Sequence, residues 1–370
     1  MMKILYGVQG TGNGHITRAR AMAQAFEQQD VKVDYLFSGR DQHKYFDMEC
    51  FGEYQLRKGV TFNYSHGKVQ PIKTMLNCDL RQFGKDVRDL SLSGYDLVIN
   101  DFEPVTAWAA KKQGIPCIGL SHQACFLQRV PQKGMGMTDR ALTRWFAPAN
   151  HNIGIHWYHY QQKILPPVIT HQEVVAGDPN KILVYLPFEQ LEDVVLLLKD
   201  FSEYSFECFH PDAKDKNLGH IQLRGLCRNG FQQAMKQASG IIANAGFELS
   251  SEALCMGRKL LIKPLHGQFE QASNLMVLEQ LGLATALPEL CAEQVEDWLP
   301  KMGFEAMRFP SSATPLVDWL LSGSWHDFAA VKKLMWDQVV YPEEVASKLK
   351  HFQHKTQQVT PYHSEFSQDN

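Results

Sequence analysis

The chain of 370 residues is long enough for two domains, and its 44% hydrophobic and 21% charged residues are typical of a globular protein. Its formal net charge of −3 gives no electrostatic case for nucleic acid as the main partner, which excludes that class. The eight cysteines include no C-x-x-C pair, which favours reduced, buried thiols in a cytoplasmic protein. The first residues lead directly into an apolar strand and no apolar run is long enough to cross a bilayer, so we expect neither a signal segment nor a membrane span.

Strands and helices alternate through the first half of the chain. The predicted strands are 3–10, 31–39, 95–102 and 115–122, and the predicted helices are 15–29 and 104–114. The second of these helices has Pro104 near its start and Gly114 at its end, the usual asymmetry of helix termini. This order predicts a parallel, doubly wound sheet.

A linker at 165–169 and 176–180 separates this pattern from a second one that also opens on Lys-Ile-Leu. The second pattern has predicted strands at 181–188, 205–211, 240–246 and 259–265, and helices at 189–201, 247–257 and 271–282. The sequence therefore predicts an α/β fold of two Rossmann-like domains, 1–168 and 169–326, that face each other across a cleft. We expect residues 327–353 to form a helix that packs back on the first domain, and residues 354–370 to be a disordered polar tail.

The stretch after the first strand, "GVQGTGNGHITRARAMAQAF", carries Gly10, Gly12 and Gly14 directly before His15. This spacing departs from the G-x-G-x-x-G of a dinucleotide site, and no Lys-Ser/Thr pair follows as in a P-loop. Residues 38–40 (Ser-Gly-Arg) end the second strand and leave NADP as one alternative, because an arginine there suits a 2′-phosphate. Ligands of doubly wound sheets bind beyond the carboxyl ends of the strands, which is where this stretch lies.

His15 is predicted to lie at the start of a helix, where the positive end of the helix dipole disfavours protonation. A neutral imidazole that faces the cleft is a competent general base, and the alternative is a histidine that only caps the helix. Asp101 ends the strand expected beside the first one, where its carboxylate is placed to orient the imidazole. Glu103 is the fallback for this role, and the alternative for Asp101 is an N-cap of the following helix.

Residues 241–274 have the pattern strand, Gly turn, helix, strand, polar loop, helix. The turn at 244–247 offers free backbone N–H groups at a helix start, which suit a pyrophosphate. Glu252 lies two turns along that helix, where a carboxylate can bind both hydroxyls of a ribose. Glu270 and Gln271 open the next helix and are placed for sugar hydroxyls, with Asn274 one turn later on the same face.

These residues resemble the nucleotide-sugar signature of GT-B glycosyltransferases, especially the MurG-like and UDP-glycosyltransferase branch with its little-characterised bacterial and archaeal members. Gly246 and Glu252 keep that family's spacing between a Gly turn and a ribose-binding Glu. Pro264 and residues 270–274 match its strand end and its Asp/Glu-Gln-x-x-Asn motif. "GTGNGH" is similar to its Gly-rich loop with the catalytic histidine, and "LSHQA" (120–124) faintly resembles its His/Gln-bearing loop. The resemblance extends from about residue 3 to about residue 285.

The resemblance implies an inverting transferase that moves a hexose-type sugar from a nucleotide diphosphate, most often UDP, to an acceptor hydroxyl. It implies His15 as base with Asp101 as its partner, and no cofactor or metal, in keeping with the lack of a D-x-D motif. The donor contacts expected on this basis are Gly12, Gly14, Arg224, Asn244, Ala245, Gly246, Phe247, Glu248, Glu252, His266, Gln268, Glu270 and Gln271, and the acceptor contacts are His122 and Gln123. Two departures from the family are the bulky, acidic "YLPFEQ" (185–190) in place of a Gly/Ser-rich phosphate loop, and Asn244 in place of a phosphate-facing histidine.

Other segments keep alternatives open. Residues 222–231, with Arg224, are expected to contact the base of the nucleotide, but Arg224 equally suits a surface charge. "HWYHY" holds His156-x-x-His159, which indicates either a metal pair or aromatic packing. Residues 125–148 combine apolar and basic side chains, which suits peripheral membrane contact with a lipid-linked acceptor or a packed helix with a solvated basic face. The alternatives to a transferase are a nucleotide-sugar 2-epimerase and a non-catalytic nucleotide-sugar-binding protein.

Overall fold

The computed structural model describes residues 1–60, 64–65, 68–69, 79–170 and 173–358. Its first sheet has seven parallel strands in the order β3-β2-β1-β6-β7-β8-β9. The strands are β1 (Met2–Gln9), β2 (Val31–Ser38), β3 (Tyr54–Arg57), β6 (Leu97–Asp101), β7 (Cys117–Ser121), β8 (His151–Ile155) and β9 (Ile164–Leu165). β4 (Tyr64–Ser65) and β5 (Lys68–Val69) form a separate antiparallel pair. The predicted adjacency of β1 and β6 is confirmed, with Val8 opposite Asp101.

The helices of this first half connect the strands of its sheet. They are α1 (Asn13–Phe26), α3 (Leu80–Asp89), α4 (Pro104–Gln113) and α5 (Met137–Phe146), with 3₁₀ turns at Gln42–Lys44, Glu49–Phe51 and Gln123–Leu127. α4 begins on Pro104 and ends at Gly114, whose φ of 71° lies in the left-handed region that closes many helices. The predicted start and end of this helix are therefore confirmed.

The second sheet also has seven strands, in the order β12-β13-β11-β10-β14-β15-β16, and only β12 runs antiparallel to its neighbour. The strands are β10 (Asp178–Tyr185), β11 (Ser205–Phe209), β12 (Lys216–Leu218), β13 (Ile221–Arg224), β14 (Ala238–Asn244), β15 (Lys259–Lys263) and β16 (Thr285–Ala286). The helices are α6 (Leu191–Leu198), α7 (Arg228–Gln237), α8 (Phe247–Cys255), α9 (Phe269–Leu281) and α10 (Ala292–Trp298). The chain is thus an α/β protein with two Rossmann-like halves, as predicted.

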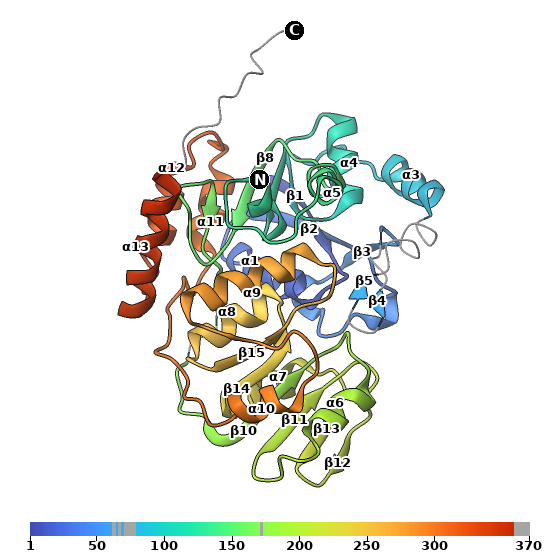
Figure 1. Cartoon of the computed structure of the whole chain (residues 1–370). Coiled ribbons are helices and arrows are strands. Elements are labelled where there is room, and N and C mark those ends of the chain that lie inside the picture. The colour runs from blue at the N-terminus through green and yellow to red at the C-terminus, as the bar shows by residue number, and fades with distance from the viewer. Residues whose placement is uncertain (61–63, 66–67, 70–78, 171–172, 359–370) are drawn as a thin grey trace.

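The two halves meet through helices. Figure 1 shows α1 between the first sheet and helices α8 and α9 of the second half, and α1 packs against α8. One apolar cluster continues from β1 and α1 into α8 and α9, so the core is shared across the junction. The buried Trp157 adds a polar link, because its Nε1 donates to Ser251 Oγ of α8 at 2.8 Å.

The C-terminal segment differs from its prediction as one helix at 327–353. It follows α11 (Thr314–Leu321) and consists of α12 (Ala329–Trp336) and α13 (Glu343–Gln358), with Pro342 between them. Proline lacks an N–H group and disfavours helix in the residue before it, which separates the two. Trp336 Nε1 donates to Ile164 O of the first half at 2.8 Å, whereas Lys348 Nζ of α13 donates to Leu281 O of the second at 3.0 Å. Residues 354–358 of the predicted tail are helical, and the rest of the tail lies outside the described residues.

The cysteines are more varied than predicted. Of those described, Cys117, Cys125, Cys208 and Cys255 are buried free thiols, but Cys50 and Cys227 are exposed. Among the described residues, no helix combines the length and the hydrophobicity that a membrane crossing needs.

Candidate functional site

The Gly-rich loop between β1 and α1 is held by its own half of the molecule. Gly10 N donates to Ser38 O at 2.6 Å. Arg40 donates to Thr11 O at 3.1 Å and to Asn13 Oδ1 at 2.9 Å, so the arginine considered for a 2′-phosphate fastens the loop instead. Gly12 is the N-cap of α1 and gives the helix no side-chain cap, which leaves the N–H groups of its first turn without an intrahelical partner. His15 lies in this first turn.

His15 and Asp101 are in direct contact at the carboxyl ends of β1 and β6. The imidazole Nδ1 lies 2.7 Å from Asp101 Oδ1, and the side chains are 13% and 0% exposed. Burial alone would raise the pKa of Asp101, but Arg18 and His15, by charge and hydrogen bonding, lower it below its ordinary value. An ionised carboxylate at this distance requires the proton on Nδ1, which leaves the lone pair of Nε2 for an incoming proton.

Glu103, the fallback for Asp101, has a structural role. It is buried, caps α4 by accepting from Val105 N and Thr106 N at 2.8 and 2.6 Å, and accepts from Ser38 Oγ at 2.6 Å. Glu103 is therefore the N-cap of the helix, and the alternative interpretation of Asp101 as that cap is wrong.

Arg18 is a member of the site that sequence reasoning missed. It is buried, with Nε 2.7 Å from Asp101 Oδ2 and Nη2 2.9 Å from Asp101 Oδ1. Its Nη1 donates to Glu248 Oε1 in the first turn of α8, so one guanidinium links the two halves. Its position three residues after His15 was the available signal, because such residues share a helix face.

Glu248, expected near the donor, turns its side chain toward the first half. Burial, together with the nearby charges of Asp101 and Glu252, raises its pKa to about 7, against the opposing effect of Arg18 and His15. Its protonation state therefore changes near neutral pH.

The start of α8 has the expected glycine turn, but one of the N–H groups expected to be free is already hydrogen-bonded. Gly246 is the N-cap and gives no side-chain cap, but its own N–H donates to Asn244 O at 2.7 Å and is not free. Asn244 donates to Lys263 O at 3.0 Å, while its buried Oδ1 has no hydrogen-bond partner within the described residues. Ala245 O accepts from Asn274 Nδ2 at 3.0 Å.

Glu252 faces the junction between the halves. It lines a cavity of about 70 Å³ together with Thr17 and Arg20 of α1, Arg228 and Gln232 of α7, and residues 168–170. Gln232 Nε2 donates to Glu252 Oε2 at 2.9 Å. Burial raises the pKa of Glu252, and Gln232, Arg228 and Arg20 oppose that rise.

The residues expected to contact the acceptor lie within the junction instead. His122 is 2% exposed, stacks on Phe247 with ring centroids 4.0 Å apart, and has its two ring nitrogens 2.8 Å from Ile155 O and Asn274 Oδ1. Gln123 Nε2 donates to Glu270 Oε2 at 3.1 Å. Because both nitrogens of His122 are occupied, we correct its expected role from acceptor contact to contact between the halves.

Several expected donor contacts are occupied by protein groups. Gln271 Oε1 accepts from Leu265 N at 2.9 Å, so this buried side chain shapes the loop before α9. Arg224 donates to Asn217 Oδ1, Leu223 O and Gln222 Oε1 at 2.8–2.9 Å, which holds it at its own sheet edge. His266 is exposed, and Gln268 Oε1 is a buried acceptor without a partner within the described residues. Unlike Gln271 and Arg224, Gln268 therefore keeps a side-chain oxygen that no described residue occupies, and its contact with the sugar donor stays a prediction.

The acidic loop residue Glu189 forms an ion pair. Its Oε1 lies 2.9 Å from Lys263 Nζ at the end of β15, and both side chains are buried. The charge of Glu189, which the Gly/Ser-rich phosphate loop of the family lacks, is therefore balanced by the ammonium group of Lys263.

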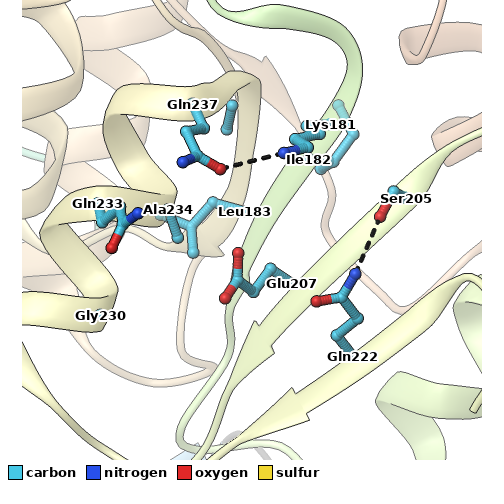
Figure 2. A pocket seen from close by; sticks show the side chains of 11 residues that line it. Lys181, Ile182, Leu183, Ser205, Glu207, Gln222, Gly230, Gln233, Ala234 and Gln237 are labelled. Atoms are coloured by element: carbon cyan, nitrogen blue, oxygen red, sulfur yellow. Dashed lines mark hydrogen bonds between the residues drawn. The ribbon is translucent and has the colours of Figure 1, made fainter. Parts of the chain in front are cut away.

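A second groove is lined by none of the residues around His15. Figure 2 shows it between α7 and strands β10, β11 and β13, with Lys181 donating to Gln237 and Gln222 to Ser205. It measures about 260 Å³, and of the predicted site segments only 222–231 reaches it, through Gln222 and Gly230. Within the described residues, no group of three or more His, Cys, Asp or Glu side chains is placed to hold a metal ion. His156 is buried against Trp157 and Tyr160, as in the packing interpretation.

Comparisons with known proteins agree with this arrangement. The family model described as glycosyl transferase family 1 matches residues 2–303. The glycosyltransferase SnogD from Streptomyces nogalater is similar in structure, with a TM-score of 0.54, 16% identity and coverage of 95% of this chain and 99% of that one. UGT2 of Phytolacca americana, solved with UDP-2fluoro-glucose and pterostilbene, has a TM-score of 0.56, 10% identity and coverage of 96% and 99%. No protein with curated annotation matches this chain. The solved structures establish the GT-B fold.

Proposed function

The chain belongs to glycosyl transferase family 1 and is a glycosyltransferase, and on this premise we propose that it transfers a hexose-type sugar, with inversion, from a UDP-sugar to an acceptor hydroxyl. One observation carries the proposal: the His15–Asp101 pair of the first half is joined through Arg18 to Glu248 in the first turn of α8 from the second half. A base on one half and a helix N-terminus on the other are what transfer from a diphosphate requires.

Three features of the second half favour a nucleotide sugar as donor. The first turn of α8 has no side-chain cap, and its N–H groups suit a diphosphate. Glu252 lines the cavity between the halves, where its carboxylate is placed for ribose hydroxyls. Asn244 Oδ1 and Gln268 Oε1 are buried acceptors without a partner among the described residues, and they suit hydroxyl groups of a sugar, which donate hydrogen bonds. The choice of UDP is supported by the Phytolacca enzyme, which was solved with UDP-2fluoro-glucose.

The proposed reaction follows from the tautomer of His15. The free Nε2 takes the proton of the acceptor hydroxyl as its oxygen forms a bond to the anomeric carbon. The bond from that carbon to the diphosphate breaks, and UDP leaves with the electron pair. Asp101 stabilises the imidazolium, and the N-terminal end of α8 stabilises the charge that develops on the diphosphate. These groups supply the step without a bound metal.

We place the acceptor at the first half, beside α5. On this helix Met137, Leu142 and Trp145 are 90%, 46% and 53% exposed, and Arg140 and Arg144 are exposed between them. Exposed apolar side chains among basic ones suit the surface of an anionic membrane, which favours a lipid-linked acceptor.

The first test is a calorimetric binding panel of UDP-, dTDP-, GDP- and ADP-sugars, with NADP as the control for the dinucleotide alternative. We expect saturable binding of a UDP-sugar and none of NADP. Binding of NADP alone would contradict the proposal.

The second test compares His15→Ala with His43→Ala, a matched change of an exposed histidine in a 3₁₀ turn. We expect His15→Ala to lose roughly 10²- to 10⁴-fold in UDP release with acceptor, and to keep its donor affinity. His43→Ala should match the wild type. Formation of a free, epimerised UDP-sugar without acceptor would favour the epimerase alternative. Binding of the sugar donor without any turnover would favour the non-catalytic binding protein.

A further inference from the structure

Arg18 has an unusual set of partners for a residue within one turn of a proposed base. Its guanidinium donates from two nitrogens to both carboxylate oxygens of Asp101, and from the third to Glu248 of the opposite half. Arg18 Nη2 also lies 3.3 Å from His15 Nδ1, farther than the 2.7 Å between that nitrogen and Asp101 Oδ1. The side chain is 8% exposed, so these contacts replace its hydration. A planar fork of five N–H donors suits this three-way geometry, which a lysine ammonium does not reproduce.

The contacts with Asp101 fix the orientation of His15. Asp101 Oδ1 accepts from His15 Nδ1 and Arg18 Nη2, and Oδ2 accepts from Arg18 Nε. The carboxylate is completely buried, and with Arg18 in place it cannot rotate without breaking charge-assisted hydrogen bonds. The plane of the carboxylate thus determines which nitrogen of His15 holds the proton.

The contact with Glu248 depends on the approach of the two halves. A Cβ atom added to Gly14 at the start of α1 would lie 3.0 Å from Glu248 Cγ, so α8 meets α1 with little room to spare. If α8 moved away, Arg18 Nη1 would lose its carboxylate while the other two nitrogens remained on Asp101. The contacts of Arg18 therefore couple the orientation of the His15 imidazole to the contact between the two halves.

We propose that Arg18 is a positioning residue, which holds the proton of His15 on Nδ1 through Asp101 and ties this arrangement to contact between the two halves through Glu248. The proposal rests on the proposed function only for the role of His15 as base. The geometry that it describes exists without donor or acceptor, so it can be tested on the free protein.

The test uses Arg18→Lys and Arg18→Met, with Arg88→Lys on the exposed face of α3 as the matched control. The first readout is the pair of ¹⁵N chemical shifts of the His15 ring in histidine-labelled protein, assigned by comparison with His15→Ala. We expect the Nδ1–H tautomer in the wild type and in Arg88→Lys, and a mixture of tautomers in Arg18→Met. Arg18→Lys keeps the charge without the fork and should be intermediate.

The second readout is turnover of the donor identified in the binding panel. We expect kcat to fall about 100-fold in Arg18→Met and about tenfold in Arg18→Lys, with donor affinity within threefold of the wild type. A wild-type tautomer in a folded Arg18→Met protein would overturn the proposal, as would a fully active Arg18→Lys protein. If no nucleotide sugar binds the wild type, the proposed function fails, while the ring shifts still decide the role of Arg18.

Discussion

The loops that precede α1 and α8 are both glycine-containing turns between a parallel strand and a helix, but their glycines meet different surroundings. A Cβ atom at Gly10 would lie 2.8 Å from the backbone oxygen of Ser38 and 2.1 Å from Tyr45 Oη. A Cβ atom at Gly246 would have no heavy atom of the described residues within 4 Å. Gly10 of the first loop is thus required by the protein itself, whereas Gly246 of the second loop has space beside it that suits a ligand.

The two loops also differ in the charges that their helices carry. α1 brings His15 and Arg18, and α8 brings Glu248 in its first turn. Glu248 lies where an anionic diphosphate is proposed to bind, and its pairing with Arg18 offsets the repulsion between the two negative charges. Glu248 is therefore the point at which the two loops depend on each other.

The largest expected effect comes from Glu248→Gln. Because the pKa of Glu248 is raised to about 7, the native state holds a proton between about pH 4.5 and 7 that the unfolded chain has released. The stability of the wild type should therefore fall by about 3 kcal/mol as the pH rises through this window, and this part of the fall should be missing in the variant. Urea unfolding at pH 5 and pH 8 measures the difference.

The same experiment contains its own control. At pH 5 the two proteins should be nearly equal in stability, because a protonated Glu and a Gln have similar size and charge. At pH 8 the variant should be the more stable one, because ionisation of a Glu248 whose pKa is raised costs the wild type stability and Gln does not ionise. A variant less stable than the wild type at pH 8 would show that the Arg18–Glu248 pair stabilises the junction.

Much of the fold could be predicted from the sequence because strands and helices of a doubly wound sheet have strong local signals. The strand from Lys259 to Lys263 and the helix from Phe247 to Cys255 were found within two residues of their ends, since apolar runs and Gly termini mark them. The break at Pro342 was missed because apolar residues continue on both sides of it. The contact of Asp101 with His15 followed from the order of two adjacent strands.

The partners across the junction could not be predicted in this way. Arg18 and Glu248 are 230 residues apart, and nothing in either local pattern indicates that they touch. His122 was assigned to the acceptor because "LSHQA" faintly resembles the His/Gln-bearing loop of the family, but Phe247 and Asn274 of the other half contact its ring. Such contacts depend on how the two folded halves pack against each other, which the local periodicity of the sequence does not indicate.

A smaller effect is expected from Gly10→Ala, which tests the crowded loop. The backbone of Ser38 must move to admit the added methyl group, at a cost of about 2 kcal/mol in the free energy of unfolding. Gly84→Ala in α3 is the matched control, because its added Cβ meets no described atom within 4 Å and alanine favours a helix. The control should therefore be slightly stabilised in the same urea titration. Equal stability of the two variants would mean that the loop around Gly10 rearranges to accept the methyl group at little cost in free energy.

The smallest effect is expected from Gly246→Ala, which tests the open loop. The added methyl group would have no atom of the described part of the chain within 4 Å, and φ at this position is −71°. The unfolding free energy should therefore change by no more than about 1 kcal/mol. The methyl group does occupy the space over the first turn of α8, and there we expect it to weaken UDP-sugar binding about tenfold, or about 1.4 kcal/mol. Calorimetry on this variant and on Gly84→Ala separates the two effects. Unchanged donor affinity in Gly246→Ala would move the diphosphate away from α8, and the openness of the second loop would then need another explanation than a ligand.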